Sequence, residues 1–209
     1  PSVTTMALAQ TESAVSVSVA SRPRRPLALF GMRPCDLAGL DKLDRVLLDR
    51  PASGEPIYAA RRSDAFVVVV NCGVVASTCF CASVETGPHV EGRSTAHDLE
   101  VTELVDEAAS TEPRYIIVPI SEQGAKILEA VRRHVDTSPV PASALERADA
   151  IRDRAERAQQ RRHPNGSVRR VLDESHDSRR WNEVAETCLA CGNCTSVCPT
   201  CFCTTNNDV

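Results

Sequence analysis

The sequence predicts an α/β fold: a partly parallel sheet domain over residues 1–140, a polar helical connector over residues 141–180 and a cysteine-rich segment over residues 181–209. Three observations lead to this division. Short apolar runs alternate with segments of helical period in the first part of the chain, as in βαβ units. Two prolines near residue 140 separate this part from a stretch of mixed charge with few apolar positions. Finally, six of the 10 cysteines fall within residues 188–203.

The composition is that of an ordinary globular chain. Apolar residues make up 42% and charged residues 25% of the 209 residues, which is enough apolar material for a core. A net charge of -4 and an aromatic content of 3% argue against a general nucleic-acid binder. The longest apolar run, Ala65 to Val70, is far too short to span a membrane. Because no segment has the form of a signal peptide, we expect a cytoplasmic protein whose cysteines bind metal rather than form disulfides.

The first elements form a strand–turn–helix unit. Valines alternate with serines over residues 15–19, which is a strand-like period of two. A second strand is predicted over Leu27 to Phe30, where Gly31 ends the apolar run. Asp36 is placed to cap a helix in which leucines recur at helical spacing over residues 37–47. Cys35 then lies in the turn between strand and helix.

Three more apolar runs complete the predicted sheet. Phe66 to Val70 is continuous and rich in β-branched residues, which indicates a strand buried on both faces. Leu99 to Leu104 alternates weakly, and Tyr115 to Ile120 is another apolar strand. Ser121 is placed to cap the helix that follows, which carries apolar residues at helical spacing over residues 127–135.

The connector begins with a capping signal. Ser143-Ala-Leu-Glu146 has the form of a capping box and predicts a polar helix that continues to about Arg162. Mixed charges and few apolar positions indicate a solvated helix. Between Ile151 and Arg180 there are nine arginines against five acidic residues, whereas residues 181–209 contain no lysine or arginine.

The C-terminal cysteines carry the most specific motif, C-x2-C-x2-C-x3-C-P over residues 188–199. One tight loop can bring three thiolates to three corners of a cubane, and in two-cluster ferredoxins the fourth cysteine binds the other cluster. Gly192 leaves room for the inorganic sulfides. Zinc sites usually consist of two C-x2-C pairs with a longer insert, so zinc and free thiols are poorer interpretations. The predicted [4Fe-4S] ligands in this incomplete, ferredoxin-like segment are Cys188, Cys191, Cys194 and Cys198.

Two further cysteines follow this motif. With Cys201 and Cys203 the segment holds more thiols than the four ligands that one cubane needs. Either some of these thiols are spare, or some bind a second centre.

A second set of cysteines lies in the first part of the chain. If the strands that precede them are parallel, their loops leave the same carboxyl edge of the sheet, where α/β sheets place ligands. Four thiolates there would suffice for a cubane or a zinc ion, although small cysteines also pack as core residues. The tetrapeptide Thr-Cys-Phe-Cys occurs in this set and again at residues 200–203. This second set of candidate ligands comprises Cys35, Cys72, Cys79 and Cys81.

Other catalytic or nucleotide-binding signals are missing from the sequence. It contains neither G-x-G-x-x-G nor G-x4-G-K-[ST]. The five histidines are scattered and fit surface or loop positions better than a zinc-ligand spacing. We therefore predict no catalytic residue and no defined substrate pocket.

Several motifs together resemble one group of iron–sulfur subunits. The first are Phe30-Gly-Met-Arg-Pro-Cys-Asp-Leu37, Asn71-Cys72 and Thr78-Cys-Phe-Cys-Ala-Ser83. Thr86-Gly-Pro88, Trp181-Asn-Glu-Val-Ala185 and the block from Cys188 to Cys203 follow in the same order. In this combination the chain resembles the beta subunit of cytoplasmic NAD(P)-linked nickel–iron hydrogenase (sulfhydrogenase) and the A subunit of anaerobic sulfite reductase.

The resemblance implies a 4Fe-4S dicluster electron-transfer subunit. Such a subunit relays electrons between a flavin-containing NAD(P)H-oxidoreductase subunit and a catalytic subunit, either hydrogenase or sulfite reductase, in a hetero-oligomer. Family members are longer and carry a second cluster motif downstream, so we expect this chain to be truncated at both ends. Two other functions stay open: an iron–sulfur oxidoreductase that binds a flavin or substrate itself, and a structural zinc module.

Overall fold

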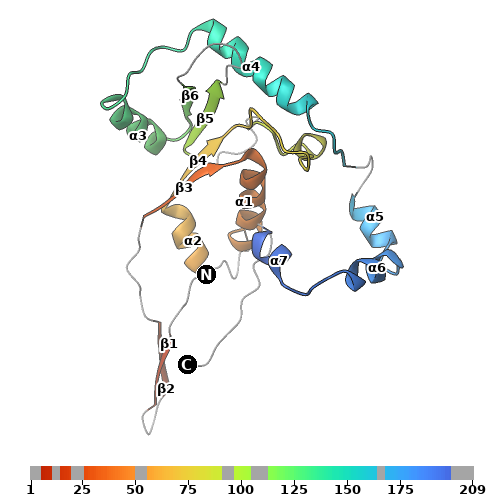
Figure 1. The fold of residues 1–209 in the computed structure, drawn as a ribbon. Helices are drawn as coiled ribbons and strands as arrows, with labels where there is room; N and C mark the ends of the chain where they lie inside the picture. Colours follow the sequence, from red (N-terminus) through yellow and green to blue (C-terminus); the bar gives the residue numbers. More distant parts are fainter. Residues whose placement is uncertain are drawn as a thin grey trace.

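The computed structural model describes the chain in seven stretches, which are residues 6–10, 15–19, 26–49, 56–90, 97–104, 113–163 and 168–198. Its centre is a four-stranded sheet in the order β3-β4-β5-β6 (Figure 1). The strands of this sheet are β3 (Leu27–Met32), β4 (Ala65–Val70), β5 (Leu99–Leu104) and β6 (Arg114–Pro119).

The sheet is mixed, which confirms the expected α/β fold with partly parallel pairing. β3 pairs in parallel with β4, and β4 pairs in parallel with β5. β5 and β6 are antiparallel, with Leu99 opposite Pro119 and Leu104 opposite Arg114. A short connection suffices between antiparallel neighbours, whereas parallel neighbours need longer crossovers. The crossover between β3 and β4 carries α1.

One face of the sheet is covered by α1 (Pro34–Leu47). Leu37 is 2% exposed and packs with Val67 and Val69 of β4. Asp36 caps this helix from its third position, because its carboxylate accepts a hydrogen bond of 2.9 Å from the backbone N–H of Arg33, the N-cap residue. Asp36 is therefore a capping residue, as expected, but it acts from inside the first turn.

The opposite face is covered by α3 (Glu122–Arg132). Leu128 of this helix packs with Val68 and Leu99. Because neighbouring residues of a strand point to opposite faces, Val68 faces α3 while Val67 and Val69 face α1, so β4 is buried on both sides as predicted. Ser121 is the N-cap, and its hydroxyl accepts a hydrogen bond of 2.9 Å from the Gly124 N–H.

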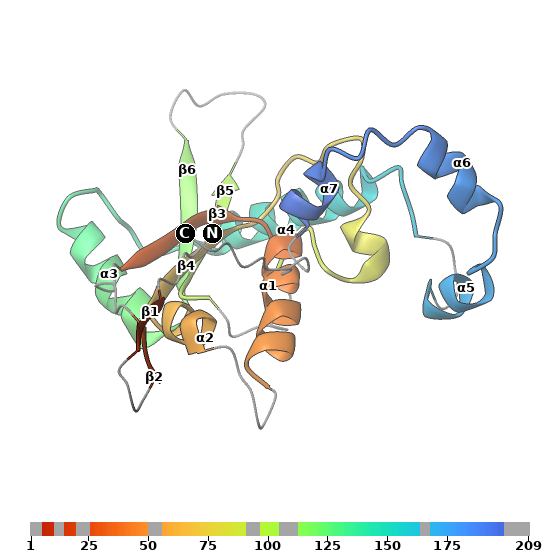
Figure 2. The ribbon, with the colours of Figure 1, turned by 90° about the horizontal axis from the view of Figure 1, so that it is seen from below.

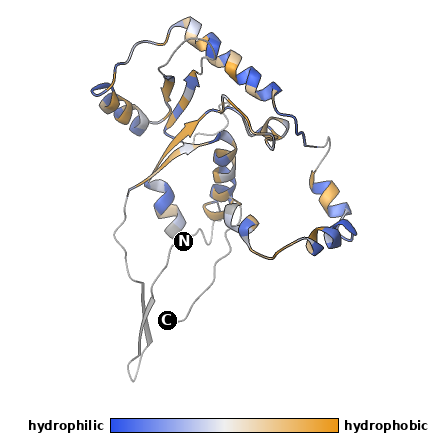
Figure 3. Ribbon diagram, in the orientation of Figure 1, coloured by the Kyte–Doolittle hydropathy of each residue, from blue (hydrophilic) through white to orange (hydrophobic). Residues whose placement is uncertain are grey.

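The connector helix α4 (Ala142–Arg157) packs on the sheet. Its residues Ala144 and Ile151 form a buried cluster with Leu104 and Ile116 of β5 and β6. Figure 3 shows hydrophilic and hydrophobic residues mixed along this helix, in contrast to the largely hydrophobic strands β3 and β4. The helix is solvated over most of its surface, as predicted, but small apolar residues at helical spacing dock one side of it on the sheet.

The ends of α4 also differ from the prediction. The N-cap residue is Pro141, which makes no side-chain hydrogen bond, so the capping box expected at Ser143 is not formed. The helix ends at Arg157 rather than near Arg162. Proline fixes the extended backbone that an N-cap requires, and Ser143 thereby falls within the first turn.

Other described elements lie outside this sheet. β1 (Met6–Gln10) and β2 (Val15–Val19) form a separate antiparallel pair, which confirms the strand predicted over residues 15–19, and α2 (Pro56–Ser63) precedes β4. After α4 come α5 (Val168–Glu174), α6 (Arg180–Glu186) and α7 (Asn193–Val197). Figures 1 and 2 show α5 and α6 standing away from the sheet. Within the described stretches, no helix has the length and apolar character needed to cross a bilayer.

Candidate metal centres

The tail cysteines, which are Cys188, Cys191, Cys194 and Cys198, lie around one short loop and helix. The first two are in the loop between α6 and α7, the third is in the first turn of α7 and the fourth is its C-cap residue. The first three are exposed and Cys198 is partly buried. None of the cysteines in the described stretches forms a disulfide. Thiol donors in a solvent-facing loop suit a group that must approach a partner protein.

The backbone of this loop turns through two residues with positive φ. Ala190 has φ 51° and Gly192 has φ 69°, both in the left-handed region. No atom lies within 4 Å of a Cβ built on Gly192, so backbone conformation, rather than crowding by protein atoms, favours glycine here. The turn directs the Ala190 N–H to the sulfur of Cys188, with a donor–acceptor distance of 3.4 Å. Backbone N–H groups that donate to cysteine sulfur raise the potential of iron–sulfur centres.

The edge cysteines, which are Cys35, Cys72, Cys79 and Cys81, lie beyond the carboxyl ends of β3 and β4. Cys35 was predicted in the turn before the helix, but it is the second residue of α1, because the helix already begins at Pro34. The other three belong to the segment after β4, in which Cys81 begins the 3-10 helix η1 (Cys81–Val84). Because β3 and β4 are parallel neighbours, the segments that follow them emerge at one edge of the sheet, as the sequence argument required.

The edge thiols share one electrostatic environment. Burial raises the pKa of the Cys35 thiol, and Asp36, Cys81 and Cys72 raise it further. Burial also raises the pKa of the Cys72 thiol, partly offset by the nearby Arg33 guanidinium. Cys81 and Cys79 raise the pKa of Cys72 in the same direction as burial, so both lie close enough to act on the Cys72 thiol.

Several contacts hold the segment after β4 in place. The Cys72 N–H donates to the Pro88 carbonyl at 3.0 Å. Gln159, which follows α4 and is 4% exposed, donates from Nε2 to the Cys81 sulfur at 3.2 Å and accepts from the Ala82 N–H at 3.0 Å. The His163 N–H donates to the Ser83 hydroxyl at 2.8 Å. Sequence reasoning missed Gln159, and no local pattern indicates it.

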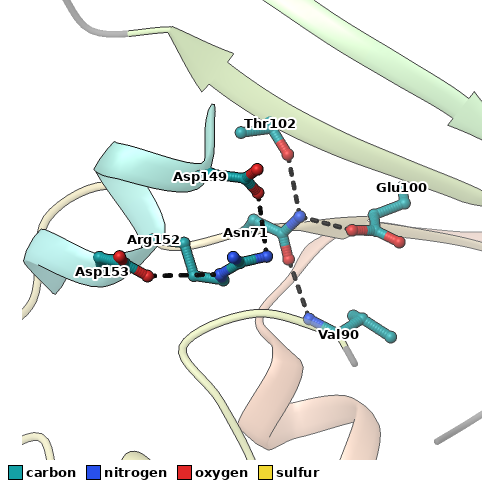
Figure 4. A network of polar contacts seen from close by, with 7 residues as sticks. All are labelled: Asn71, Val90, Glu100, Thr102, Asp149, Arg152 and Asp153. Carbon is teal, nitrogen blue, oxygen red and sulfur yellow. Dashed lines mark hydrogen bonds and ion pairs between the residues drawn. The ribbon is translucent and has the colours of Figure 1, made fainter. Parts of the chain in front are cut away.

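Asn71 supports the start of the same segment. Its Nδ2 donates to Glu100 Oε1 at 2.6 Å and to Thr102 Oγ1 at 2.9 Å, and its Oδ1 accepts from the Val90 N–H at 3.1 Å. Figure 4 shows this network, with Arg152 of α4 nearby. A buried amide that joins β5 to the loop after β4 fixes where Cys72 leaves the sheet.

Two further features of the described residues concern a histidine and a cavity. His97 is 3% exposed and lies 4.0 Å from Glu100, so it is a buried loop residue, and a loop is one of the positions predicted for the histidines. A cavity of about 260 Å³ lies between the start of α1 and the segment after β4, and no sequence motif indicated it. Its lining includes Leu37, Glu85, Gly87, His89 and Glu156.

The described side chains do not form a closed site for a single ion. Among the stretches of chain that the structure describes, no group of three or more Cys, His, Asp or Glu side chains is arranged to hold one metal ion. Cys201 and Cys203 lie outside those stretches. The tail cysteines fit an iron–sulfur cluster in two respects. They supply thiol ligands, and the loop that carries them has two residues with positive φ and a backbone N–H that donates to a cysteine sulfur.

Comparison with known proteins defines the class. Residues 152–202 match the family model of the 4Fe-4S dicluster domain, and this match includes the tail cysteines. The chain is therefore an iron–sulfur protein that binds a 4Fe-4S cluster.

A particular relative narrows this class. The chain is 31% identical over 175 residues, 84% of its own length, to sulfhydrogenase 2 subunit beta of Pyrococcus furiosus. It spans 48% of the length of that relative. The dicluster match and this similarity to a hydrogenase beta subunit confirm the resemblance found in the sequence.

Proposed function

We propose that this chain relays electrons between a flavin-containing NAD(P)H-oxidoreductase subunit and the catalytic subunit of a hetero-oligomeric hydrogenase. The observation that carries the proposal is the C-x2-C-x2-C-x3-C-P motif on an exposed loop inside the matched region. Hydrogenase is favoured over sulfite reductase because the relative is named as a sulfhydrogenase subunit. Since thiolate ligands persist in a reducing compartment, we place the protein in the cytoplasm.

The tail cysteines are the proposed ligands. Cys188, Cys191 and Cys194 would hold three corners of a cubane, and Cys198 would serve the same module as its fourth cysteine. When bound, such a cluster takes up and releases one electron at a time without bonding to a substrate. The chain supplies sulfur donors, the Ala190 N–H that reaches the Cys188 sulfur at 3.4 Å, and a loop open to partners.

Charge supports a docking role for the neighbouring segments. Nine arginines and five acidic residues lie between Ile151 and Arg180, and residues 181–209 contain acidic residues but no lysine or arginine. Two adjoining regions of opposite charge can orient different partners by electrostatic complementarity. The three-part division of the chain at residues 140 and 180 fits this arrangement of scaffold, connector and cluster segment.

Metal analysis of two variants tests the ligand set. Anaerobically purified Cys191→Ser protein should lose about four irons per chain and the part of the reduced-cubane EPR signal that the tail cluster contributes. Ser196→Ala, an exposed substitution in the same motif, is the matched control and should keep both. Stoichiometric zinc without iron in the unmodified protein would contradict the proposal and favour a structural zinc module.

The relay itself is tested with electron donors. We expect NADPH to reduce the chain only when the flavin-containing subunit is present. Reduction of the purified chain by NADPH alone, together with bound flavin absorbance, would instead show an oxidoreductase that binds its own flavin.

A further inference from the structure

Contacts around Gly87 bring the segment that carries Cys81 close to the start of α1. A Cβ on Gly87 would lie 3.0 Å from the Cys81 sulfur and 3.4 Å from Cβ of Pro34. Pro34 directly precedes Cys35, so Gly87 brings the Cys81 sulfur against the first turn of α1. Pro88 in turn accepts the hydrogen bond from the Cys72 N–H. The start of α1, which follows β3, and the segment after β4 are thus in contact at the carboxyl edge of the two strands.

The Cys81 sulfur accepts a hydrogen bond from a buried and well-anchored side chain. Gln159 is 4% exposed, and its Nε2 donates to this sulfur while its Oε1 holds the Ala82 N–H. A buried amide held at both ends in this way gives a fixed N–H donor to one thiolate. Such donors stabilise the negative charge that a metal-binding thiolate carries. A cysteine that merely fills space in a core needs no such partner.

We propose that the four edge cysteines bind a separate 4Fe-4S cluster at the carboxyl edge of β3 and β4. Neither the family match at residues 152–202 nor the proposed relay through the tail cysteines assigns this site.

The arrangement favours a cluster over a single zinc ion. Zinc–sulfur bonds of about 2.3 Å would require sulfurs within roughly 4.6 Å of one another. The described side chains include no group of three arranged to hold a single ion, although each of Cys35 and Cys72 feels the charge of other edge thiols. The spacing Cys79-Phe-Cys81 also differs from the C-x2–4-C pairs of zinc sites.

Iron analysis of two complementary variants of the full chain separates this site from the tail site. We expect about eight irons per chain in the unmodified protein and about four in Cys79→Ser/Cys81→Ser. Ser77→Ala, an exposed change in the same loop, is the matched control and should keep about eight. About four irons in the unmodified protein, unchanged in the double variant, would overturn the edge site and leave the tail site intact.

A variant of the tail cysteines tests the edge site without altering the loop that carries Cys79 and Cys81. Cys188→Ser/Cys191→Ser/Cys194→Ser changes only exposed residues far from the sheet in sequence. We expect it to retain about four irons and a reduced-cubane EPR signal. Absence of iron from this variant, or zinc in place of iron, would refute a cluster at the edge.

Gln159 gives a graded test of the same site. Gln159→Leu removes the N–H donor, so the potential of the centre that remains in the tail variant should fall in redox titration. Gln160→Leu, an exposed neighbour, should leave it unchanged. An unchanged potential in both variants would show that the remaining centre does not lie beside Cys81.

Discussion

Replacement of Asn71 by alanine removes the side-chain hydrogen bonds that link β5 to the segment after β4. The side chain makes three hydrogen bonds, to Glu100, to Thr102 and from the Val90 N–H. Each buried hydrogen bond contributes about 0.5 to 1.5 kcal/mol, and one to a charged group contributes more. The Glu100 side chain is 21% exposed, so water can replace part of its bond. We therefore expect a loss of about 3 kcal/mol in the free energy of unfolding.

Thr102→Val is the matched variant, because it keeps shape and strand propensity while removing one of the three bonds. It should cost about 1 kcal/mol. Asn71→Ala already removes the bond to Thr102. The double variant Asn71→Ala/Thr102→Val should therefore lose about 1 kcal/mol less free energy of unfolding than the two single variants added together.

Urea unfolding of the metal-free chain, followed by circular dichroism, measures these losses. The only tryptophan, Trp181, lies in α6, so intrinsic fluorescence would report on the tail instead. A loss below about 1 kcal/mol for Asn71→Ala, or full additivity with Thr102→Val, would refute the reasoning.

Three further outcomes are expected. Leu37→Ala, at a side chain that is 2% exposed, should cost about 2 to 5 kcal/mol in urea unfolding, and a cost near zero would remove it from the core. Gly124→Ala should destabilise by about 1 to 2 kcal/mol despite the higher helix propensity of alanine, because the new Cβ would meet the Asp98 carbonyl; a gain in stability would disprove the close approach. Burial and a 2.6 Å hydrogen bond to Asp44 raise the pKa of Tyr58, so the stability that this phenol contributes is fully present below about pH 10 and is lost as pH rises beyond it. Tyr58→Phe should lower stability at pH 7 by about 1 kcal/mol and weaken the decline in alkaline urea melts, whereas an identical alkaline decline would assign it to other groups.

Much of the sheet was predictable because its signals are local. The run Phe66 to Val70 can hardly be anything but a buried strand, and Ser121 stands directly before the helix that it caps. The direction of β6 was not predictable, since antiparallel and parallel strands have similar sequences. Docking of α4 left only a faint signal, because two of its three buried residues are alanines.

The candidate sites divide in the same way. The tail motif is contiguous, so spacing alone indicated its chemistry. For the edge cysteines, topology predicted which edge they share, and the parallel pairing of β3 and β4 supplies the condition that prediction needed. The contact of Gln159 with Cys81 crosses 78 residues of sequence and depends on where α4 ends, which no local pattern fixes.

That long separation has a consequence for how the protein is made. The hydrogen bonds that join Gln159 and His163 to the segment after β4 span 77 to 80 residues. During synthesis, β3, β4 and all four edge cysteines leave the ribosome well before the end of α4 exists. The nascent chain must therefore present these thiols with Cys81 still lacking its amide partner, and the loop reaches its final form only once α4 has docked. The cluster proposed at the edge cysteines can thus be inserted at two stages. One is during synthesis, before α4 exists, and the other is after α4 has docked and Gln159 has bound the segment that carries Cys81.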